Sequence, residues 1–91
     1  MILTFRSKAL RDLFIDGDSR GIRPDLVERV RARLQTLYRA KSLDDLRVPG
    51  WRLHVLHTKP ARYSIAVNGP WRITFEWKGS DATRVDLEQY H

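Results

Sequence analysis

The sequence contains no cysteine, which excludes a disulfide framework and a metal site built from thiolates. It also lacks a long hydrophobic run. The amino terminus turns charged after five residues, too early for the apolar core of a signal peptide, and no later stretch is long enough to span a membrane. No internal repeat or low-complexity tract divides the 91 residues. We therefore expect a single domain over residues 1–91, located in the cytoplasm, with no membrane contact.

Acidic residues are scarce relative to basic ones. The chain has 11 Asp and Glu against 17 Lys and Arg, which gives a net charge of +6 at pH 7 and a pI of about 10.3. Such a balance is typical of nucleic-acid-binding domains, because basic side chains neutralise phosphates. An acidic protein partner would explain the same imbalance, so the composition alone leaves both classes of partner open.

The stretch from Tyr63 to Trp77 alternates apolar and polar residues, which predicts two strands that each bury one face. Between them stands Asn68-Gly69, a pair that tolerates the positive φ of a two-residue turn and therefore predicts a hairpin. The apolar residues of both strands share one face and build a core. The polar residues form a second surface, where we look for function.

Helices are predicted on the amino-terminal side of this hairpin. Ser7 is a suitable N-cap and Gly17 a suitable stop for a first helix, while a second helix begins at Pro24 and ends near Ala40. These segments predict an α+β fold, in which an amino-terminal strand and two helices accompany a mainly antiparallel sheet of four to five strands, the helices packed on one face. The other expected elements are a strand at Ile2–Phe5, a short turn at Ser42–Leu46, a strand at Trp51–Leu56 and a last strand at Thr83–Leu87.

The polar surface is expected to be basic and open, and its residues suit the cleavage of RNA without a metal. That reaction needs a base for the 2′-hydroxyl, cations for the crowded phosphate and an acid for the leaving 5′-oxygen. Histidine transfers protons near neutral pH, and arginine carries a fixed, forked charge. The residues expected on this surface are Arg52, His54, Arg62, Ser64, Arg72, Thr74 and Glu76.

His54 and Arg72 are the central candidates for catalysis, and Tyr90 and His91 join them if the carboxyl terminus folds back onto the polar surface. Each has a plainer interpretation when taken singly. A surface strand histidine usually has no role, Arg72 can pair with Glu76, and chain ends commonly fray. Their combination on one face is what favours a catalytic site.

A metal site at His54 and His57 is disfavoured, because an odd separation places the two side chains on opposite faces of a strand and no third ligand stands nearby. We expect neither a metal nor another cofactor. The arginines of the second helix fit an RNA-binding face or, more commonly, a solvated surface. The three tryptophans are expected in the core, since they fall in phase with the apolar alternation: Trp51, Trp71 and Trp77.

Four stretches together carry a resemblance to a known family over essentially the whole chain: DGDSRGIRPDLVERVRARL, SLDDLRVPGWRLHVL, YSIAVNGPWRITFEW and the closing VDLEQYH. The chain resembles the HigB-like branch of the RelE/ParE superfamily of toxins, also described as plasmid-maintenance killer proteins. The resemblance implies a RelE-like microbial RNase-type fold and a ribosome-dependent mRNA endonuclease, or mRNA interferase, paired with an antitoxin. It also implies catalytic roles for His54, Arg72, Tyr90 and His91.

The chain departs from the family pattern at two positions. His57 stands where the family has a lysine, and Gln89 replaces the acidic residue that usually precedes the terminal Tyr-His. His57 joins the expected catalytic set in the lysine's place. Lys59 is the nearest residue that could supply the cation of the missing lysine, and Glu88 is the nearest that could supply the missing carboxylate. We expect the cations near the site to bind RNA, namely Arg52, Lys59 and Arg62.

Two functions from different classes follow from this resemblance. The first is a toxin that cuts ribosome-bound mRNA by 2′-hydroxyl attack and so inhibits translation, with the ribosome, mRNA and a cognate helix-turn-helix antitoxin (HigA-like) as partners. The second is a ParE-like toxin without catalysis, which binds and poisons a protein target such as DNA gyrase. His54 together with the terminal Tyr90 and His91 favours the first function.

Overall fold

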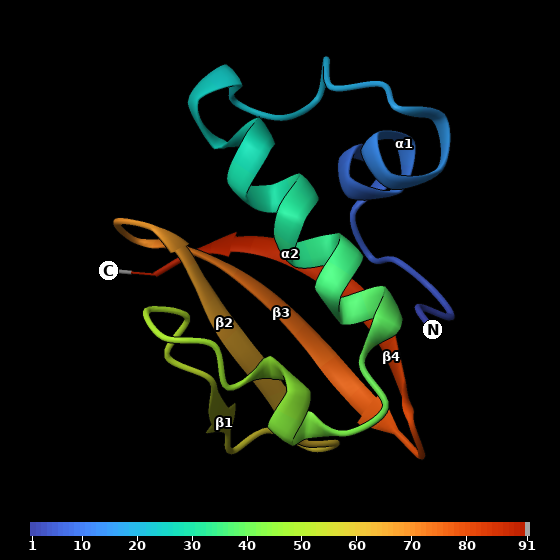
Figure 1. Ribbon diagram of the computed structural model, residues 1–91, viewed down its shortest axis with the longest axis vertical. Coiled ribbons are helices and arrows are strands. Elements are labelled where there is room, and N and C mark those ends of the chain that lie inside the picture. Colours follow the sequence, from blue (N-terminus) through green and yellow to red (C-terminus); the bar gives the residue numbers. More distant parts are fainter. Residues whose placement is uncertain (91) are drawn as a thin grey trace.

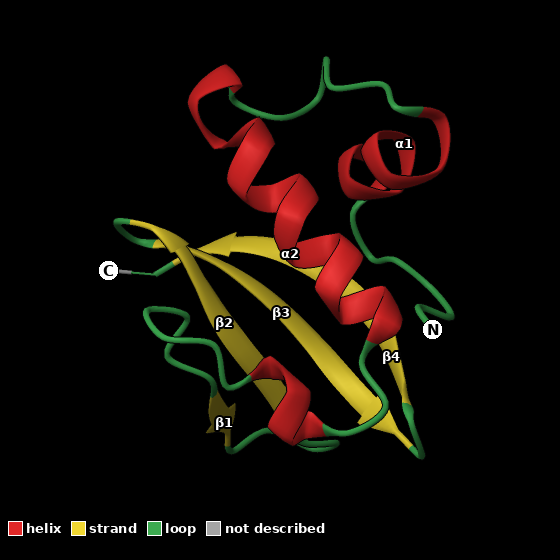
Figure 2. Cartoon of the chain, viewed as in Figure 1, coloured by secondary structure: helices red, strands yellow, loops and turns green. Residues whose placement is uncertain are grey.

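The computed structural model describes residues 1–90, and its strands form one antiparallel sheet in the order β1-β2-β3-β4 (Figure 1). The two α-helices lie over one face of that sheet (Figure 2), so the predicted α+β arrangement is confirmed. The elements are α1 (Lys8–Asp16), η1 (Pro24–Leu26), α2 (Val27–Arg39), η2 (Leu43–Leu46), β1 (His54–Leu56), β2 (Arg62–Asn68), β3 (Trp71–Lys78) and β4 (Asp81–Gln89).

The predicted ends of the first helix are confirmed. Ser7 caps α1, because its Oγ accepts a hydrogen bond from the Leu10 amide at 3.2 Å. Gly17 ends α1 with a φ of 71°, a left-handed conformation that glycine adopts at little cost. Leu10 and Leu13 are buried, so α1 faces the core along its apolar side.

The second predicted helix is divided into two parts. Pro24 opens the 3₁₀ turn η1, and the regular α2 starts at Val27 and ends at Arg39, next to the expected Ala40. A tighter first turn is common at a helix start, where the first amides have no acceptor within the helix. From α2, Val30, Leu34 and Leu37 are buried against the sheet.

The amino-terminal strand expected at Ile2–Phe5 is reduced to two isolated parallel bridges with β4, Ile2 to Ala82 and Phe5 to Val85. Between them β4 carries a bulge at Arg84, which has a φ of 52° and interrupts the pairing with β3. The bulge also moves Thr83 onto the polar side, opposite Glu76, whereas an uninterrupted strand would place Thr83 on the same side as Val85.

The hairpin turn lies one residue later than expected. Asn68 still pairs with Trp71, so the two loop residues are Gly69 and Pro70, and Gly69 has the positive φ of 55°. The displacement arises at Val67, an extra residue in β2 between the pairs that Ala66 and Asn68 form. Both β2 and β3 keep their predicted apolar faces toward the helices.

The strand expected at Trp51–Leu56 is shorter in the structure, because only His54–Leu56 pairs with β2. Arg52 has a φ of 51°, which ends the extended backbone before His54. The preceding loop nevertheless stays on the sheet, since the Trp51 carbonyl accepts a hydrogen bond from the Ala66 amide at 2.6 Å.

The core lies between the helices and the sheet, and the three tryptophans pack against it while half-buried. Within the described residues, no helix has both the length and the apolar composition needed to cross a membrane. The fully buried aliphatic and aromatic side chains include Leu10, Val30, Leu34, Leu37, Leu46, Ile65, Ile73, Phe75 and Val85.

Candidate active site on the polar face of the sheet

The strand register places the polar side chains in two rows across the face that the helices leave uncovered. One row runs through all four strands as His54, Ser64, Thr74 and Asp86, and a second joins Arg72 on β3 to Glu88 on β4. Directly opposed residues on antiparallel strands project to the same side. The polar surface predicted from the alternation therefore exists.

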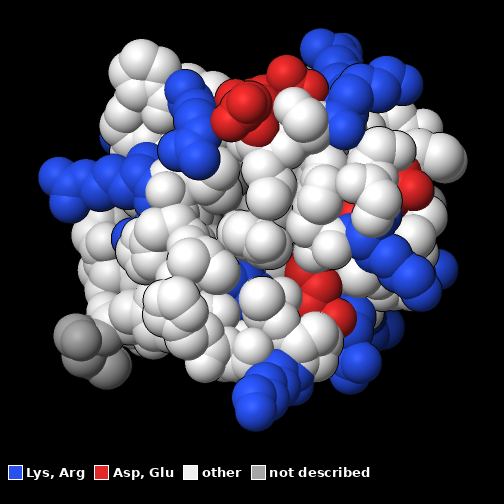
Figure 3. Space-filling view, turned by 90° about the horizontal axis from the view of Figure 1, so that it is seen from below, with Lys and Arg blue, Asp and Glu red and all other residues white. Residues whose placement is uncertain are grey.

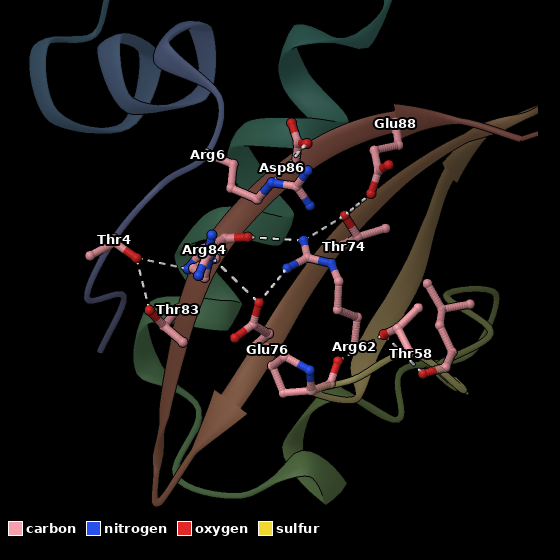
Figure 4. A network of polar contacts seen from close by, with 12 residues as sticks. Thr4, Arg6, Thr58, Arg62, Thr74, Glu76, Thr83, Arg84, Asp86 and Glu88 are labelled. Carbon is pink, nitrogen blue, oxygen red and sulfur yellow. Dashed lines mark hydrogen bonds and ion pairs between the residues drawn. The ribbon is translucent and has the colours of Figure 1, made fainter.

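The expectation that this surface is open is wrong at its centre. Ser64 and Thr74 are fully buried, and Arg62 is 8% exposed. The Arg62 guanidinium lies along the sheet, where it donates to Glu76 Oε2 at 3.1 Å, to Thr74 Oγ1 at 3.0 Å and to the Arg84 carbonyl at 2.9 Å (Figure 4). Arg62 was predicted to bind RNA, but its charge is engaged inside the protein.

Arg72 is held by neutral acceptors. Its Nε donates to Ser64 Oγ at 2.9 Å, and one terminal nitrogen donates to the Arg52 carbonyl at 3.0 Å. The alternative pairing with Glu76 is not formed, because Glu76 binds Arg62 and lies 3.6 Å from Arg84 Nε. Burial lowers the pKa of Arg72 below its usual value. Its guanidinium is therefore fixed in direction, while no carboxylate neutralises it among residues 1–90.

Three predicted site residues meet in one cleft of about 520 Å³, which is lined by His54, Leu56, Thr58, Arg72 and Tyr90. His54 is exposed on the edge strand β1. Tyr90 follows β4 and is tied to the hairpin turn, since its amide donates to the Pro70 carbonyl at 2.8 Å. Burial, and after it the charge of Glu88, raises the pKa of Tyr90, so its hydroxyl stays protonated at neutral pH.

Arg72 also lines a second cleft of about 350 Å³, between the β2–β3 hairpin and the loop before β1. Arg52 and Arg72 both line it, and the charge of Arg52 contributes to lowering the pKa of Arg72. This cleft is therefore lined by two cations. Arg52 is exposed, as an RNA-binding residue must be.

The remaining predicted residues lie at the margin or beyond the described chain. His57 and Lys59 are exposed in the loop between β1 and β2, and neither lines the cleft around Arg72. Thr58 lines the cleft from between them, and its Oγ1 donates to the Pro60 carbonyl at 2.8 Å. His91 falls outside the described residues. Within residues 1–90, no three His, Asp or Glu side chains converge as a metal site requires.

Arg33 on α2 has a role that the sequence analysis missed. Its Nε donates to the Ala66 carbonyl at 2.6 Å, and its guanidinium carbon lies 4.9 Å from the centre of the Trp51 ring. Arg33 therefore pins the loop whose Arg52 carbonyl holds Arg72. Its position beside the buried Leu34 was the available signal, because an arginine at the border of an apolar stripe can lay its stem on the core.

Comparison with known proteins shows the family of the chain. Residues 3–91 match the HigB-like toxin family, described as the RelE-like toxin of the type II toxin-antitoxin system HigB. A protein of Proteus vulgaris named Endoribonuclease HigB is 35% identical over 92 residues, an alignment that covers 100% of both chains. The resemblance drawn from the four sequence stretches is confirmed, and this chain belongs to the HigB-like family of RelE-like toxins of type II toxin-antitoxin systems.

Proposed function

We propose that this chain is an endoribonuclease toxin that cleaves mRNA on the ribosome and thereby inhibits translation. The observation that carries the proposal is the meeting of His54, Arg72 and Tyr90 in one cleft, with the Arg72 charge bound only by neutral acceptors among the described residues. The name of the Proteus vulgaris relative supports the same activity.

The proposed reaction is an in-line transfer within the RNA. The 2′-oxygen attacks the adjacent phosphorus and gives its proton to a base, the bond from phosphorus to the 5′-oxygen breaks, and an acid protonates that oxygen. The products are a 2′,3′-cyclic phosphate and a free 5′-hydroxyl. Arg72 stabilises the charge that builds on the phosphate oxygens. His54 and His91 exchange the two protons, and Tyr90 stacks on a base next to the cut.

The shape of the site supports the proposed dependence on the ribosome. The cleft is shallow, and the exposed His54 and Tyr90 cannot by themselves align a flexible RNA strand for in-line attack. A ribosome that presents mRNA in a fixed path supplies this alignment. We propose that Arg52 and Lys59 bind flanking phosphates and that the exposed His57 contacts RNA beside them, whereas Arg62 serves the protein interior.

Membership in a type II toxin family implies an antitoxin partner. We propose that this partner is a helix-turn-helix protein of the HigA type, and that both proteins act in the cytoplasm, where ribosomes translate. A tagged toxin expressed with the neighbouring small reading frame should copurify with that product, and growth arrest should appear when the partner is omitted. Arrest that the partner does not relieve would contradict the pairing.

The proposed activity is tested with purified protein, mRNA and ribosomes. We expect mRNA to be cut in the presence of ribosomes and naked RNA of the same sequence to stay intact under the same conditions. Intact ribosome-bound mRNA at high protein would refute the proposal. If purified gyrase then lost supercoiling activity in the presence of the protein, the chain would be a gyrase-poisoning toxin instead.

A further inference from the structure

Arg72 and Glu88 stand directly opposite each other on β3 and β4, yet they do not form an ion pair. Opposite charges at facing positions of an antiparallel pair normally attract. Here Arg72 donates instead to Ser64 Oγ and to the Arg52 carbonyl, which carry no charge. Something therefore holds the Glu88 carboxylate in another direction.

That restraint is Thr74, the residue on β3 two positions after Arg72. The Thr74 hydroxyl donates to Glu88 Oε2, and its oxygen accepts a hydrogen bond from Arg62 at 3.0 Å (Figure 4). Thr74 is fully buried, so its hydroxyl has no competing water. Arg62 is fixed in turn by Glu76 and by the Arg84 carbonyl. The chain Arg62, Thr74, Glu88 thus crosses β2, β3 and β4.

Without its hydrogen bond to Thr74, the Glu88 carboxylate would pair with Arg72. Its strand position faces Arg72, and attraction between opposite charges is stronger in a partly buried site than in water. A guanidinium paired with a carboxylate offers less charge and fewer free donors to a phosphate. Pairing with Glu88 would therefore compete with RNA for Arg72.

We propose that Thr74 and Arg62 are positioning residues for RNA cleavage, which anchor the Glu88 carboxylate away from Arg72 and so keep its charge available to the phosphate. The inference rests on the proposed function, because it assumes that Arg72 binds the reacting phosphate. It assigns no contact with RNA to Thr74, Arg62 or Glu88.

The test compares ribosome-dependent cleavage rates in a set of variants. Thr74→Val removes the hydroxyl and keeps the side-chain volume, and Arg62 retains its bonds to Glu76 and Arg84. We expect Thr74→Val to slow cleavage by about tenfold or more, below the roughly hundredfold loss typical of removing a transition-state donor. Thr74→Ser, which keeps the hydroxyl, should cleave nearly as the unchanged protein does.

The decisive variant is the double substitution Thr74→Val with Glu88→Gln. A neutral amide cannot neutralise Arg72, so the double variant should recover most of the lost rate, while Glu88→Gln alone should leave it nearly unchanged. Thr83→Val is the matched control, since it removes a hydroxyl from the same sheet that bonds only to Thr4 among the described side chains. Melting temperatures show whether a variant fails through unfolding.

Each outcome has a definite meaning. A Thr74→Val protein that is fully active, or that stays impaired after Glu88→Gln, overturns the positioning role. Equal loss in Thr74→Ser and Thr74→Val overturns it as well, because the hydroxyl would then be irrelevant. If the unchanged protein cuts no mRNA on ribosomes, the proposed function fails first, and that result is distinct from a failed rescue.

Discussion

At the scale of single residues, the partners of a side chain decide whether its charge is available to RNA. Arg62 and Arg72 are two of the arginines of the same polar face. The Arg62 guanidinium donates to Glu76, to Thr74 and to the Arg84 carbonyl. The Arg72 guanidinium donates to two uncharged groups, the Ser64 hydroxyl and the backbone carbonyl of Arg52. The sequence predicts that both arginines lie on this face, because alternation along a strand determines which face of the sheet each side chain occupies. It cannot predict which one is buried, since that depends on bulges and on side-chain direction.

Replacing Arg72 with alanine should lower the rate of mRNA cleavage by about a hundredfold, because one donor to the transition-state phosphate is lost. The fold should persist, since Arg72 is half-buried at the rim of the cleft and outside the apolar core. Cleavage assays and thermal unfolding of the same preparation measure the two effects. Arg20→Ala, at a site 90% exposed beside Asp18, is the matched control and should remain active. An Arg72→Ala protein that does not fold would make the residue structural.

Tyr90 should act through its ring more than through its hydroxyl. Its raised pKa keeps the phenol protonated, so it is a poor base at neutral pH. Stacking on a base is worth roughly 1 to 3 kcal/mol, and Tyr90→Phe should therefore retain most of the activity that Tyr90→Ala loses. Cleavage rates with a single mRNA reporter measure the difference. Equal losses in the two variants would show that the hydroxyl takes part.

At the scale of elements, the sequence predicts the central strands well and the edges poorly. β2 and β3 are buried on one side by the helices, so their alternation is plain. β1 is shortened where Arg52 adopts a positive φ, and the amino-terminal segment is limited to isolated bridges beside the bulge at Arg84. A bulge depends on how a strand pairs with the neighbouring strand, and the residues of one strand alone do not predict that pairing. The same bulge moved Thr83 to the polar side.

The link between α2 and the loop before β1 should be measurable as stability. Arg33→Met keeps an apolar stem but loses the hydrogen bond to Ala66 and the contact with the Trp51 ring, a loss of about 1 to 2 kcal/mol. For a domain of this size that corresponds to a melting temperature lower by roughly 4 to 16 °C. Arg31→Met, whose partner Glu28 is largely exposed, is the control and should change little. An unaltered melting temperature in Arg33→Met would show that these contacts between α2 and the loop do not stabilise the protein.

At the scale of the whole molecule, the net charge of +6 is spread over the surface. In the face shown in Figure 3, the Lys and Arg side chains stand around the rim with acidic groups between them. This face therefore has no single basic patch that would mark a binding site, and composition predicts a polyanionic partner without saying where it binds. The structure points to one place for that partner, because Arg52 and Arg72 line one cleft and Arg72 also lines the cleft that holds His54 and Tyr90.

Binding to ribosome-bound mRNA should weaken as salt rises, because phosphate contacts release counterions. If Arg52 and Lys59 each contact one phosphate, their combined replacement by alanine should reduce the slope of log affinity against log salt by about two. Affinity measured at several salt concentrations gives the slope. The control is Lys8→Ala with Arg20→Ala, which removes the same charge from exposed positions in and after α1. An equal change of slope in both double variants would contradict specific phosphate contacts.

The most direct measurement of the central claim is the chemistry of the ends that the protein leaves on ribosome-bound mRNA. Attack by the 2′-hydroxyl, with Arg72 on the phosphate and histidines moving the protons, predicts fragments that carry a 2′,3′-cyclic phosphate or its hydrolysis product and a free 5′-hydroxyl. Such fragments should accumulate about a hundredfold more slowly with the Arg72→Ala variant. Fragments with a 5′-phosphate and a 3′-hydroxyl, or no fragments at all, would contradict the account.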